Sequence, residues 1–226
     1  MNTEHRGLLI AMSLGDGYIA RQKLGACNIV IEHSQNQLEY LQHKAKLINS
    51  IFGGKYPTIY TRERLDARTA KVYKQCSFAK GDNYFKLLHR WIYCNNNKKT
   101  YTKQILDMLT PHGIAIWYMD DGCCKLYTSK KTNKISCCQT YIATHCSETE
   151  AKLIQEYFQT THGIDFKVYK RNSGLCEICT NTTGSKKFVE LIRPYVIESM
   201  KYKIRHVPET LYVHECPTPA MGEDIG

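Results

Sequence analysis

The sequence lacks any apolar run that approaches the roughly 20 residues required by a membrane-spanning helix. Its N-terminal apolar stretch is broken by Gly15-Asp16-Gly17, and it shows no small-residue cleavage site of the kind that ends a secretory signal. These absences argue against an integral membrane protein and a secreted one. We therefore expect a globular protein that is soluble and intracellular.

Acidic residues are scarce relative to basic ones. The 226 residues include 21 Asp plus Glu against 31 Lys plus Arg, which gives a net charge of +10 and a pI near 9.0. Such a surplus indicates a polyanionic partner, either nucleic acid or an acidic membrane surface. The 16 tyrosines favour nucleic acid, because tyrosine can both stack on bases and hydrogen-bond to phosphates.

The 11 cysteines do not form the dense framework of a small secreted domain, so reduced thiols and a reducing compartment are the simpler expectation. A structural zinc is the less favoured alternative. Cys176-x-x-Cys179 has the spacing of zinc ligands, and Cys123-Cys124 could face Cys137-Cys138 across a hairpin. However, the same residues also fit the alternation of β-strands.

One short stretch occurs twice. GLLIAMSLGDG at 7–17 reappears in altered form as GIAIWYMDDG at 113–122, and each copy is an apolar run that ends in Asp-Gly. The two aspartates, Asp16 and Asp121, stand 121 − 16 = 105 residues apart. An Asp-Gly pair by itself most often marks a turn. Its duplication at the end of two apolar helical patterns suggests two similar halves joined along two helices.

The segments between the two copies support a duplication. We expect a first helix capped by Asn2 or Thr3 that stops at Gly17, because glycine readily adopts the left-handed conformation after a helix end. The periodicity then predicts strands and helices in the order α-β-β-α-β-β-α, at 18–32 (two strands), 37–52, 56–60, 71–78 and 84–93.

The second half repeats this order. Thr110-Pro111 is a strong helix start, and KQILDML at 103–109 forms a short helix before it. The elements expected after the second motif are strands at 123–127 and 135–143, a helix at 148–161, strands at 166–169 and 175–180, and a helix at 186–192. We accordingly divide the chain into an N-terminal half at 1–99, a linker at 100–110, a C-terminal half at 111–215 and a tail at 216–226.

The end of each motif helix offers chemistry as well as structure. A helix C-terminus carries free carbonyls and partial negative charge, so an aspartate there needs a compensating cation. Carboxylate and carbonyl oxygens together form a hard ligand set that suits Mg²⁺ or Ca²⁺. A lysine follows each aspartate at a matched distance, Lys99 at 83 residues after Asp16 and Lys203 at 82 after Asp121.

LIAMSLGDG at 9–17 and IAIWYMDDG at 114–122 resemble the paired motifs of the LAGLIDADG homing endonucleases, specifically the single-chain members that carry two motifs. NNNKKT at 95–100, the Thr-Pro before the second motif, and LIRPYVIESMKYK at 191–203 are also similar to segments of such members. The resemblance covers nearly the whole chain, although the motif itself is degenerate.

This resemblance implies an α+β fold of two pseudo-symmetric αββαββα halves, packed through the two motif helices, with antiparallel sheets that form a DNA-binding saddle. It implies a monomer that binds two or three divalent ions, Mg²⁺ in catalysis with Ca²⁺ or Mn²⁺ able to substitute in binding. The metal-binding catalytic aspartates are Asp16 and Asp121, the carbonyls of Gly15 and Asp120 approach metal, and Lys99 and Lys203 lie near the cleaved phosphates. We expect a metal-bound water as the nucleophile, because no histidine or third carboxylate lies beside both motifs in the sequence.

Base recognition should fall to side chains on the strands, with lysine and arginine holding phosphates. The first-half candidates are Arg21, Gln22, Asn28, Glu32, Arg62, Arg64, Arg68, Tyr73 and Gln75. The second-half candidates are Lys125, Tyr127, Lys130, Lys134, Gln139, Tyr141, Lys167, Tyr169, Lys170 and Arg171. Because the two sets differ, we expect a long and largely non-palindromic target.

The function expected from these features is intron-homing-type cleavage of both strands of double-stranded DNA, leaving short 3′ overhangs. One alternative is a relative of the same fold that acts as an intron RNA maturase or a DNA-binding regulator. A second alternative is a basic zinc-containing adaptor. A mitochondrion, a chloroplast, or a bacterial or phage-infected cytoplasm would each suit such a protein.

Overall fold

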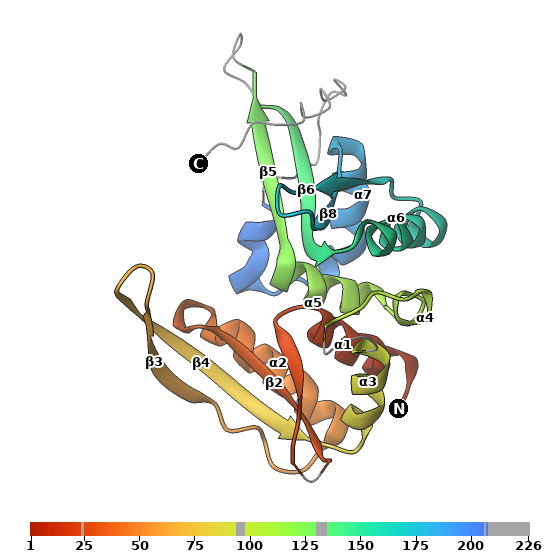
Figure 1. Cartoon of the computed structure of the whole chain (residues 1–226). Coiled ribbons are helices and arrows are strands. Elements are labelled where there is room, and N and C mark those ends of the chain that lie inside the picture. The colour runs from red at the N-terminus through yellow and green to blue at the C-terminus, as the bar shows by residue number, and fades with distance from the viewer. Residues whose placement is uncertain (24, 94–97, 130–134, 206, 208–226) are drawn as a thin grey trace.

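The computed structural model describes residues 1–23, 25–93, 98–129, 135–205 and 207. Two four-stranded antiparallel sheets lie on opposite sides of a central pair of helices (Figure 1). The strand orders, β1-β2-β4-β3 and β5-β6-β8-β7, are the same in the two halves. The fold is therefore α+β with two pseudo-symmetric halves, as the duplication predicted.

The element order also agrees with the sequence. The first half contains α1 (Thr3–Leu14), β1 (Gly17–Arg21), β2 (Cys27–Ser34), α2 (Leu38–Phe52), β3 (Tyr60–Asp66), β4 (Lys71–Gly81) and α3 (Tyr84–Ile92). After the short α4 (Lys103–Leu106), the second half contains α5 (Pro111–Asp121), β5 (Gly122–Thr128), β6 (Ile135–Cys146), α6 (Glu148–His162), β7 (Phe166–Lys170), β8 (Cys176–Thr180) and α7 (Thr182–Ile192). Three 3₁₀ turns complete the described elements, at Gln35–Gln37, Arg193–Tyr195 and Glu198–Lys203.

The central helices α1 and α5 are buried around most of their circumference, because each packs on the other and on its own half. In α1 every residue from Gly7 to Leu14 is buried, and in α5 every residue from Gly113 to Met119. A side chain at Gly113 would come within 2.8 Å of the Gly7 carbonyl oxygen, so the helices meet backbone to backbone. This close packing brings the C-terminal ends of α1 and α5 together.

The ends of these helices differ from the sequence expectation. Helix α1 stops at Leu14 rather than Gly17, and Gly17 does not have a positive φ. Glycine is required there for space, because a side chain would overlap the Met12 carbonyl oxygen. At the helix starts the prediction was correct: the Asn2 side chain accepts a hydrogen bond from the His5 amide at 2.8 Å, and Thr110 caps α5 with Pro111 at its first turn.

Two further boundaries were predicted wrongly. The strand expected at 56–60 is instead β3 at Tyr60–Asp66, a charged sequence on the edge of its sheet whose pattern is not that of a buried strand. Helix α7 begins at Thr182 rather than Lys186, because the Asn181 side chain accepts a hydrogen bond from the Gly184 amide at 2.9 Å. Neither shift changes the order of elements.

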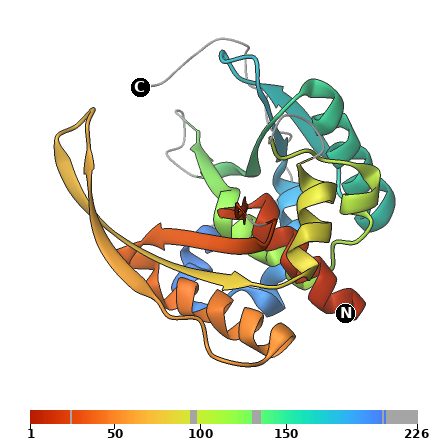
Figure 2. The same ribbon diagram turned by 60° about the horizontal axis from the view of Figure 1, so that its bottom comes forward.

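Strands β3 and β4 extend beyond the helices as a curved ribbon (Figure 2).

Within the described residues, no helix is both long and apolar enough to cross a bilayer. Eight cysteines in these ranges are free thiols, and Cys137, which is disulfide-bonded, departs from the expectation of reduced thiols. The tail at 216–226 lies outside the described residues.

Candidate functional site

The site forms where the two central helices end. Asp16 follows α1 with 42% of its side chain exposed, and Asp121 is the last residue of α5. Burial raises the pKa of Asp121 to about 7, and the negative charges of Asp120 and Asp16 add to the effect. Burial and the charge of Asp120 also raise the pKa of Asp16. Burial therefore leaves both carboxylates less stable as anions than they would be in water, and a bound cation would compensate for this.

Lys99 and Lys203 lie at equivalent places on the two helix ends. The Lys99 ammonium donates hydrogen bonds to the carbonyl oxygens of Gly15 and, at 3.3 Å, Leu14. The Lys203 ammonium donates to the carbonyl oxygen of Asp120 at 2.9 Å. Burial lowers the pKa of both lysines. The matched spacing in the sequence thus corresponds to a matched contact with the unpaired carbonyls of a helix C-terminus.

Hydrogen bonds anchor the backbone near each lysine. The stretch after residue 97 is tied to the second half through Tyr101, whose amide donates to Glu150 at 3.0 Å and whose hydroxyl donates to the Thr144 carbonyl at 3.3 Å. The Tyr118 hydroxyl donates to the Lys203 carbonyl at 2.9 Å. Both ammonium groups are therefore directed at the helix ends.

A group of residues that sequence reasoning missed lies behind Asp120. Its carboxylate accepts hydrogen bonds from the Lys44 ammonium at 2.5 Å and the Tyr40 hydroxyl at 2.9 Å, both from α2. The side chains of Lys44 and Asp120 are completely buried. A charged residue among the apolar positions of α2, three after Leu41 and one before Ala45, was the available signal, because a lysine is rarely buried without a partner.

His33, also missed, connects Lys44 to Asp16. Its Nε2 lies 3.1 Å from the Lys44 ammonium, and its Nδ1 lies 3.3 Å from Asp16 Oδ2. An ammonium has only donors, so Nε2 must be the acceptor and Nδ1 must carry the proton that faces Asp16. Burial and the charge of Lys44 lower the pKa of His33 to about 3, consistent with this neutral form. No histidine lies beside both motifs in the sequence, but in the structure β2 brings His33 to the end of α1.

The donors at the helix ends fit a divalent cation. Asp16 and Asp121 supply carboxylates whose raised pKa values favour an added positive charge, and the carbonyls of Gly15 and Asp120 supply further oxygens. Among the described residues, one cluster of three or more candidate ligands occurs, at Asp16, His33 and Asp120. Both Asp120 oxygens are already engaged by protein donors, so we assign its carboxylate to structure rather than to metal. The cysteines considered above as zinc ligands are not members of this cluster.

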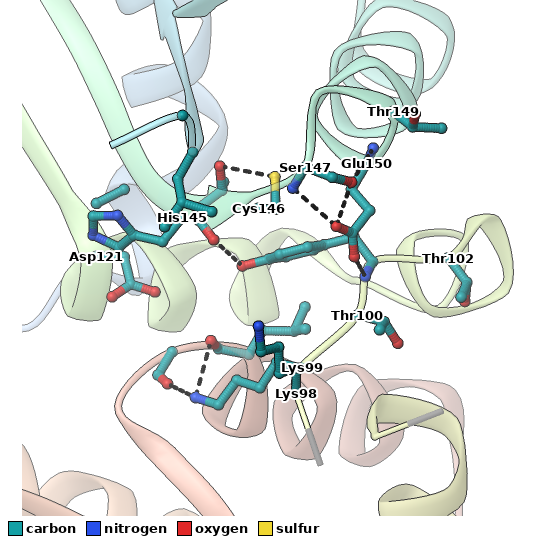
Figure 3. Close-up of a pocket in the computed structure, with 17 residues that line it drawn as sticks. Lys98, Lys99, Thr100, Thr102, Asp121, His145, Cys146, Ser147, Thr149 and Glu150 are labelled. Carbon is teal, nitrogen blue, oxygen red and sulfur yellow. Dashed lines mark hydrogen bonds between the residues drawn. The ribbon is translucent and has the colours of Figure 1, made fainter. Parts of the chain in front are cut away.

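A cavity of about 1010 Å³ opens beside Asp121. Gly15, Lys99, Asp121 and His145 are among the residues that line it, and it continues between the 98–102 segment and the start of α6. Figure 3 shows the side chains of Asp121 and Lys99 at this cavity, with Glu150 at its other end. The cavity gives a phosphate and its solvent room next to a carboxylate and an ammonium group.

The candidate recognition residues of the first half mostly share one face of their sheet. Residues that pair across antiparallel strands point to the same face. The pairs Ser34↔Gln75, Arg62↔Gln75 and Arg64↔Tyr73 define a face opposite the one that carries the buried Ile29 and Ile31. Six candidates lie on this outer face: Asn28, Glu32, Arg62, Arg64, Tyr73 and Gln75.

The second sheet has a corresponding face, on which Gln139 and Tyr141 are buried. The pairs Lys125↔Gln139 and Tyr169↔Glu177 define it, and its members are Lys125, Tyr127, Gln139, Tyr141, Lys167 and Tyr169. Several of its side chains contact one another. The hydroxyls of Tyr127 and Tyr141 lie 2.9 Å apart, and the Lys125 ammonium lies 4.7 Å from the centre of the Tyr141 ring.

Other candidates lie elsewhere. Arg21 pairs with Cys27 on the helix-covered face and borders a small hollow against α3, and Lys170 pairs with buried Cys176. Arg171 forms an ion pair with Glu177 at 2.7 Å, which occupies part of its guanidinium. Gln22 follows β1, and Arg68 is in the turn between β3 and β4. Lys130 and Lys134 lie outside the described residues.

Comparison with known proteins gives one family match. A family model described as the LAGLIDADG DNA endonuclease family matches residues 6–209. The solved structure of the homing endonuclease I-WcaI bound to its DNA recognition sequence aligns with a TM-score of 0.74 at 20% identity, covering 90% of this chain and 86% of that one. The likeness to that structure concerns the fold.

Curated relatives fall into several kinds. The DNA endonuclease I-ChuI of Chlamydomonas applanata is 24% identical, covering 90% of this chain and 95% of its own length. The cytochrome b mRNA maturase bI2 of Saccharomyces cerevisiae is 24% identical over 90% of this chain and 48% of its own length. Protein RecA of Mycobacterium shimoidei is 28% identical over 87% of this chain, which spans less than half (45%) of that relative.

Proposed function

The chain belongs to the LAGLIDADG DNA endonuclease family, and we propose that it is a site-specific homing endonuclease that hydrolyses both strands of a long, largely non-palindromic DNA site. The observation that carries the proposal is the two-fold arrangement at the ends of α1 and α5. Each end presents one aspartate with a raised pKa and one lysine bound to the carbonyl beside it. This gives two similar reaction centres, one for each strand.

Divalent ions, Mg²⁺ in the proposed reaction, would polarise the scissile phosphates and supply an activated water. Asp16 and Asp121 would hold them, with the carbonyls of Gly15 and Asp120 as further oxygen donors. Lys99 and Lys203 are placed to stabilise negative charge that develops on the phosphate. The Nδ1–H of His33 orients the Asp16 carboxylate. Cleavage across the minor groove would leave short 3′ overhangs.

The two outer sheet faces would bind the DNA. In the first half Arg62 and Arg64 lie beside Tyr73 and Gln75, and in the second Lys125 and Lys167 lie among tyrosines and Gln139. Cationic groups would hold phosphates, and the amides and hydroxyls would read base edges. One chain supplies both halves, so we propose that the protein acts as a monomer, with 1–99 and 111–215 as the two units.

Cleavage of a plasmid library in Mg²⁺ tests this function. The parent protein should linearise plasmids that carry one particular sequence, whereas the double variant Asp16→Asn/Asp121→Asn should leave them intact. Asp107→Asn is a matched control, because Asp107 is an aspartate paired with Lys103 on an exposed part of α4's C-terminal end. Equal cutting by the parent and the double variant would refute the assignment of the aspartates.

A second function, as an intron RNA maturase, is favoured by the likeness to the maturase bI2. The same basic outer faces could bind folded RNA. If so, the double aspartate variant should promote splicing of its host intron as well as the parent does, because RNA binding does not need the metal site. Failure of both proteins to bind intron RNA in a filter assay would remove this candidate.

A further inference from the structure

The two motif ends differ in one contact that crosses between the halves. Asp120 Oδ2, from α5, accepts a hydrogen bond from the backbone amide of Asp16 at 3.0 Å. Gly15 occupies the position in the first motif that Asp120 occupies in the second, and a side chain at Gly15 would overlap the Asp120 carboxylate. The missing side chain in one half is therefore replaced by the carboxylate of the other.

This carboxylate is held by a polar group that the second half does not repeat. Helices α2 and α6 have the same length of 15 residues, so Lys44 and Tyr40 correspond in position to Ile154 and Glu150. Ile154 is completely buried among apolar side chains, and Glu150 caps its own helix. The buried ammonium therefore has no counterpart at the matched position of α6.

The group reaches Asp16 from two sides. Asp120 fixes the Asp16 amide, and Lys44 also contacts His33, which donates its Nδ1 proton to the Asp16 carboxylate. Lys44 further lies 4.5 Å from the centre of the Tyr40 ring, so its charge is surrounded by partners. A buried charge pair of this kind costs desolvation energy and often stabilises a fold no better than apolar residues would. Its contacts with both Asp120 and His33 indicate a role in geometry.

We propose that Asp120, fixed by Lys44, is a positioning residue for Asp16, so that losing the Asp120 carboxylate disorders the first reaction centre while sparing the second. The inference rests on the proposed function only for its effect on DNA. It assigns Asp120 a purpose different from that of its neighbour Asp121, although the two adjacent carboxylates look alike in the sequence.

Two double variants separate positioning from simple support of the fold. Lys44→Met/Asp120→Asn and Lys44→Met/Asp120→Ala both remove the two buried charges, but only the first retains an oxygen that can accept the Asp16 hydrogen bond. Ile154→Ala is the control, because it weakens the core of the other half at the matched helix position. Denaturant unfolding shows whether the variants have comparable stability.

The first readout is hydrogen exchange of the Asp16 amide, measured by NMR on the protein without DNA. We expect exchange to be about tenfold or more faster in the Asp120→Ala pair than in the Asp120→Asn pair, because an amide is protected by its hydrogen bond. Ile154→Ala should raise the exchange rate of the Asp16 amide only as far as it makes global unfolding more frequent. Equal exchange in the two pairs would overturn the proposal.

The second readout is cleavage of a target duplex labelled on each strand. The Asp120→Ala pair should cut one strand about tenfold or more slowly than the Asp120→Asn pair does, and the other strand within about threefold of that pair's rate, so a nicked product accumulates. Equal slowing of both strands would contradict selective positioning. If the parent cuts no DNA, the proposed function fails, and the exchange measurement still decides whether Asp120 positions Asp16.

Discussion

The two motif ends carry equivalent aspartates in unequal surroundings. Asp16 is partly exposed and is contacted by His33 and by a carboxylate from the opposite half. Asp121 ends its helix in a half that has buried Ile154, not a lysine, at the matched position of α6, and it has a pKa of about 7. The comparison shows that duplication can preserve the reacting groups while their support diverges, because the helix interface lets one half complete the other.

The largest effect should come from breaking the buried ion pair. Lys44→Met leaves the Asp120 carboxylate buried with no opposite charge, which should lower the free energy of unfolding by about 3–5 kcal/mol. Ile154→Met, at the matched position of α6, should cost less than about 1.5 kcal/mol. Urea unfolding of both variants measures the difference. Similar small losses would show that the two halves are supported alike.

A smaller effect is expected from filling the space at Gly15. In Gly15→Ala the new methyl group overlaps the Asp120 carboxylate, so we expect a loss of roughly 2–3 kcal/mol. Adding Asp120→Ala to this variant removes the carboxylate from the overlap and leaves only the Cβ of residue 120, at 2.7 Å, so the combined loss should be smaller than the sum of the two single losses. A double-mutant cycle from denaturant unfolding gives this coupling. Strict additivity would mean that the two positions do not meet.

Asp121 makes metal-free stability depend on pH. Its pKa of about 7 lies above the usual value of 3.8, so the folded protein is destabilised when this carboxyl group ionises. The parent is free of this destabilisation at low pH and acquires it as the pH rises from about 4 to 7. Asp121→Asn avoids this destabilisation, and should be more stable than the parent by roughly 1–3 kcal/mol at pH 8, with a smaller gain at pH 5. Thermal unfolding in EDTA at both pH values checks it. A gain independent of pH would contradict the raised pKa.

The smallest effect concerns the two faces of the second sheet. Lys167 lies on the outer face and Lys170 on the opposite one, although both are exposed. If the outer face binds phosphates, Lys167→Ala should reduce the slope of log affinity against log salt by about 0.9, and Lys170→Ala should leave it unchanged. Binding titrations at several salt concentrations measure the slopes. Equal slopes for both variants would place the DNA elsewhere.

Much of this arrangement could be predicted from sequence because it depends on local patterns. The apolar runs ending in Asp-Gly and the caps at Asn2 and Thr110 each have a local physical cause, and the matched spacing of Lys99 and Lys203 follows from the duplication. The match to residues 6–209 confirms the family resemblance, whereas the roles that it implies for the aspartates stay a prediction.

What could not be predicted depends on contacts between distant segments. His33 and Asp16 meet because β2 pairs with β1 in a particular register. This register could not be predicted from one sequence without the structure. Lys44 was visible as a charge on an apolar helix face, but its partner Asp120 comes from the other half. Gly17 is required by close packing with Met12, which no turn rule describes.

The rate of strand cleavage under single-turnover conditions tests the central claim, that Asp16 and Asp121 form the metal-dependent reaction centre, most directly. On a selected target duplex in Mg²⁺, the parent and the Asp107→Asn control should cut both strands at the same rates, and Asp16→Asn/Asp121→Asn should lose at least about 10³-fold on both. Cutting by the double variant within about tenfold of the parent rate would contradict the account.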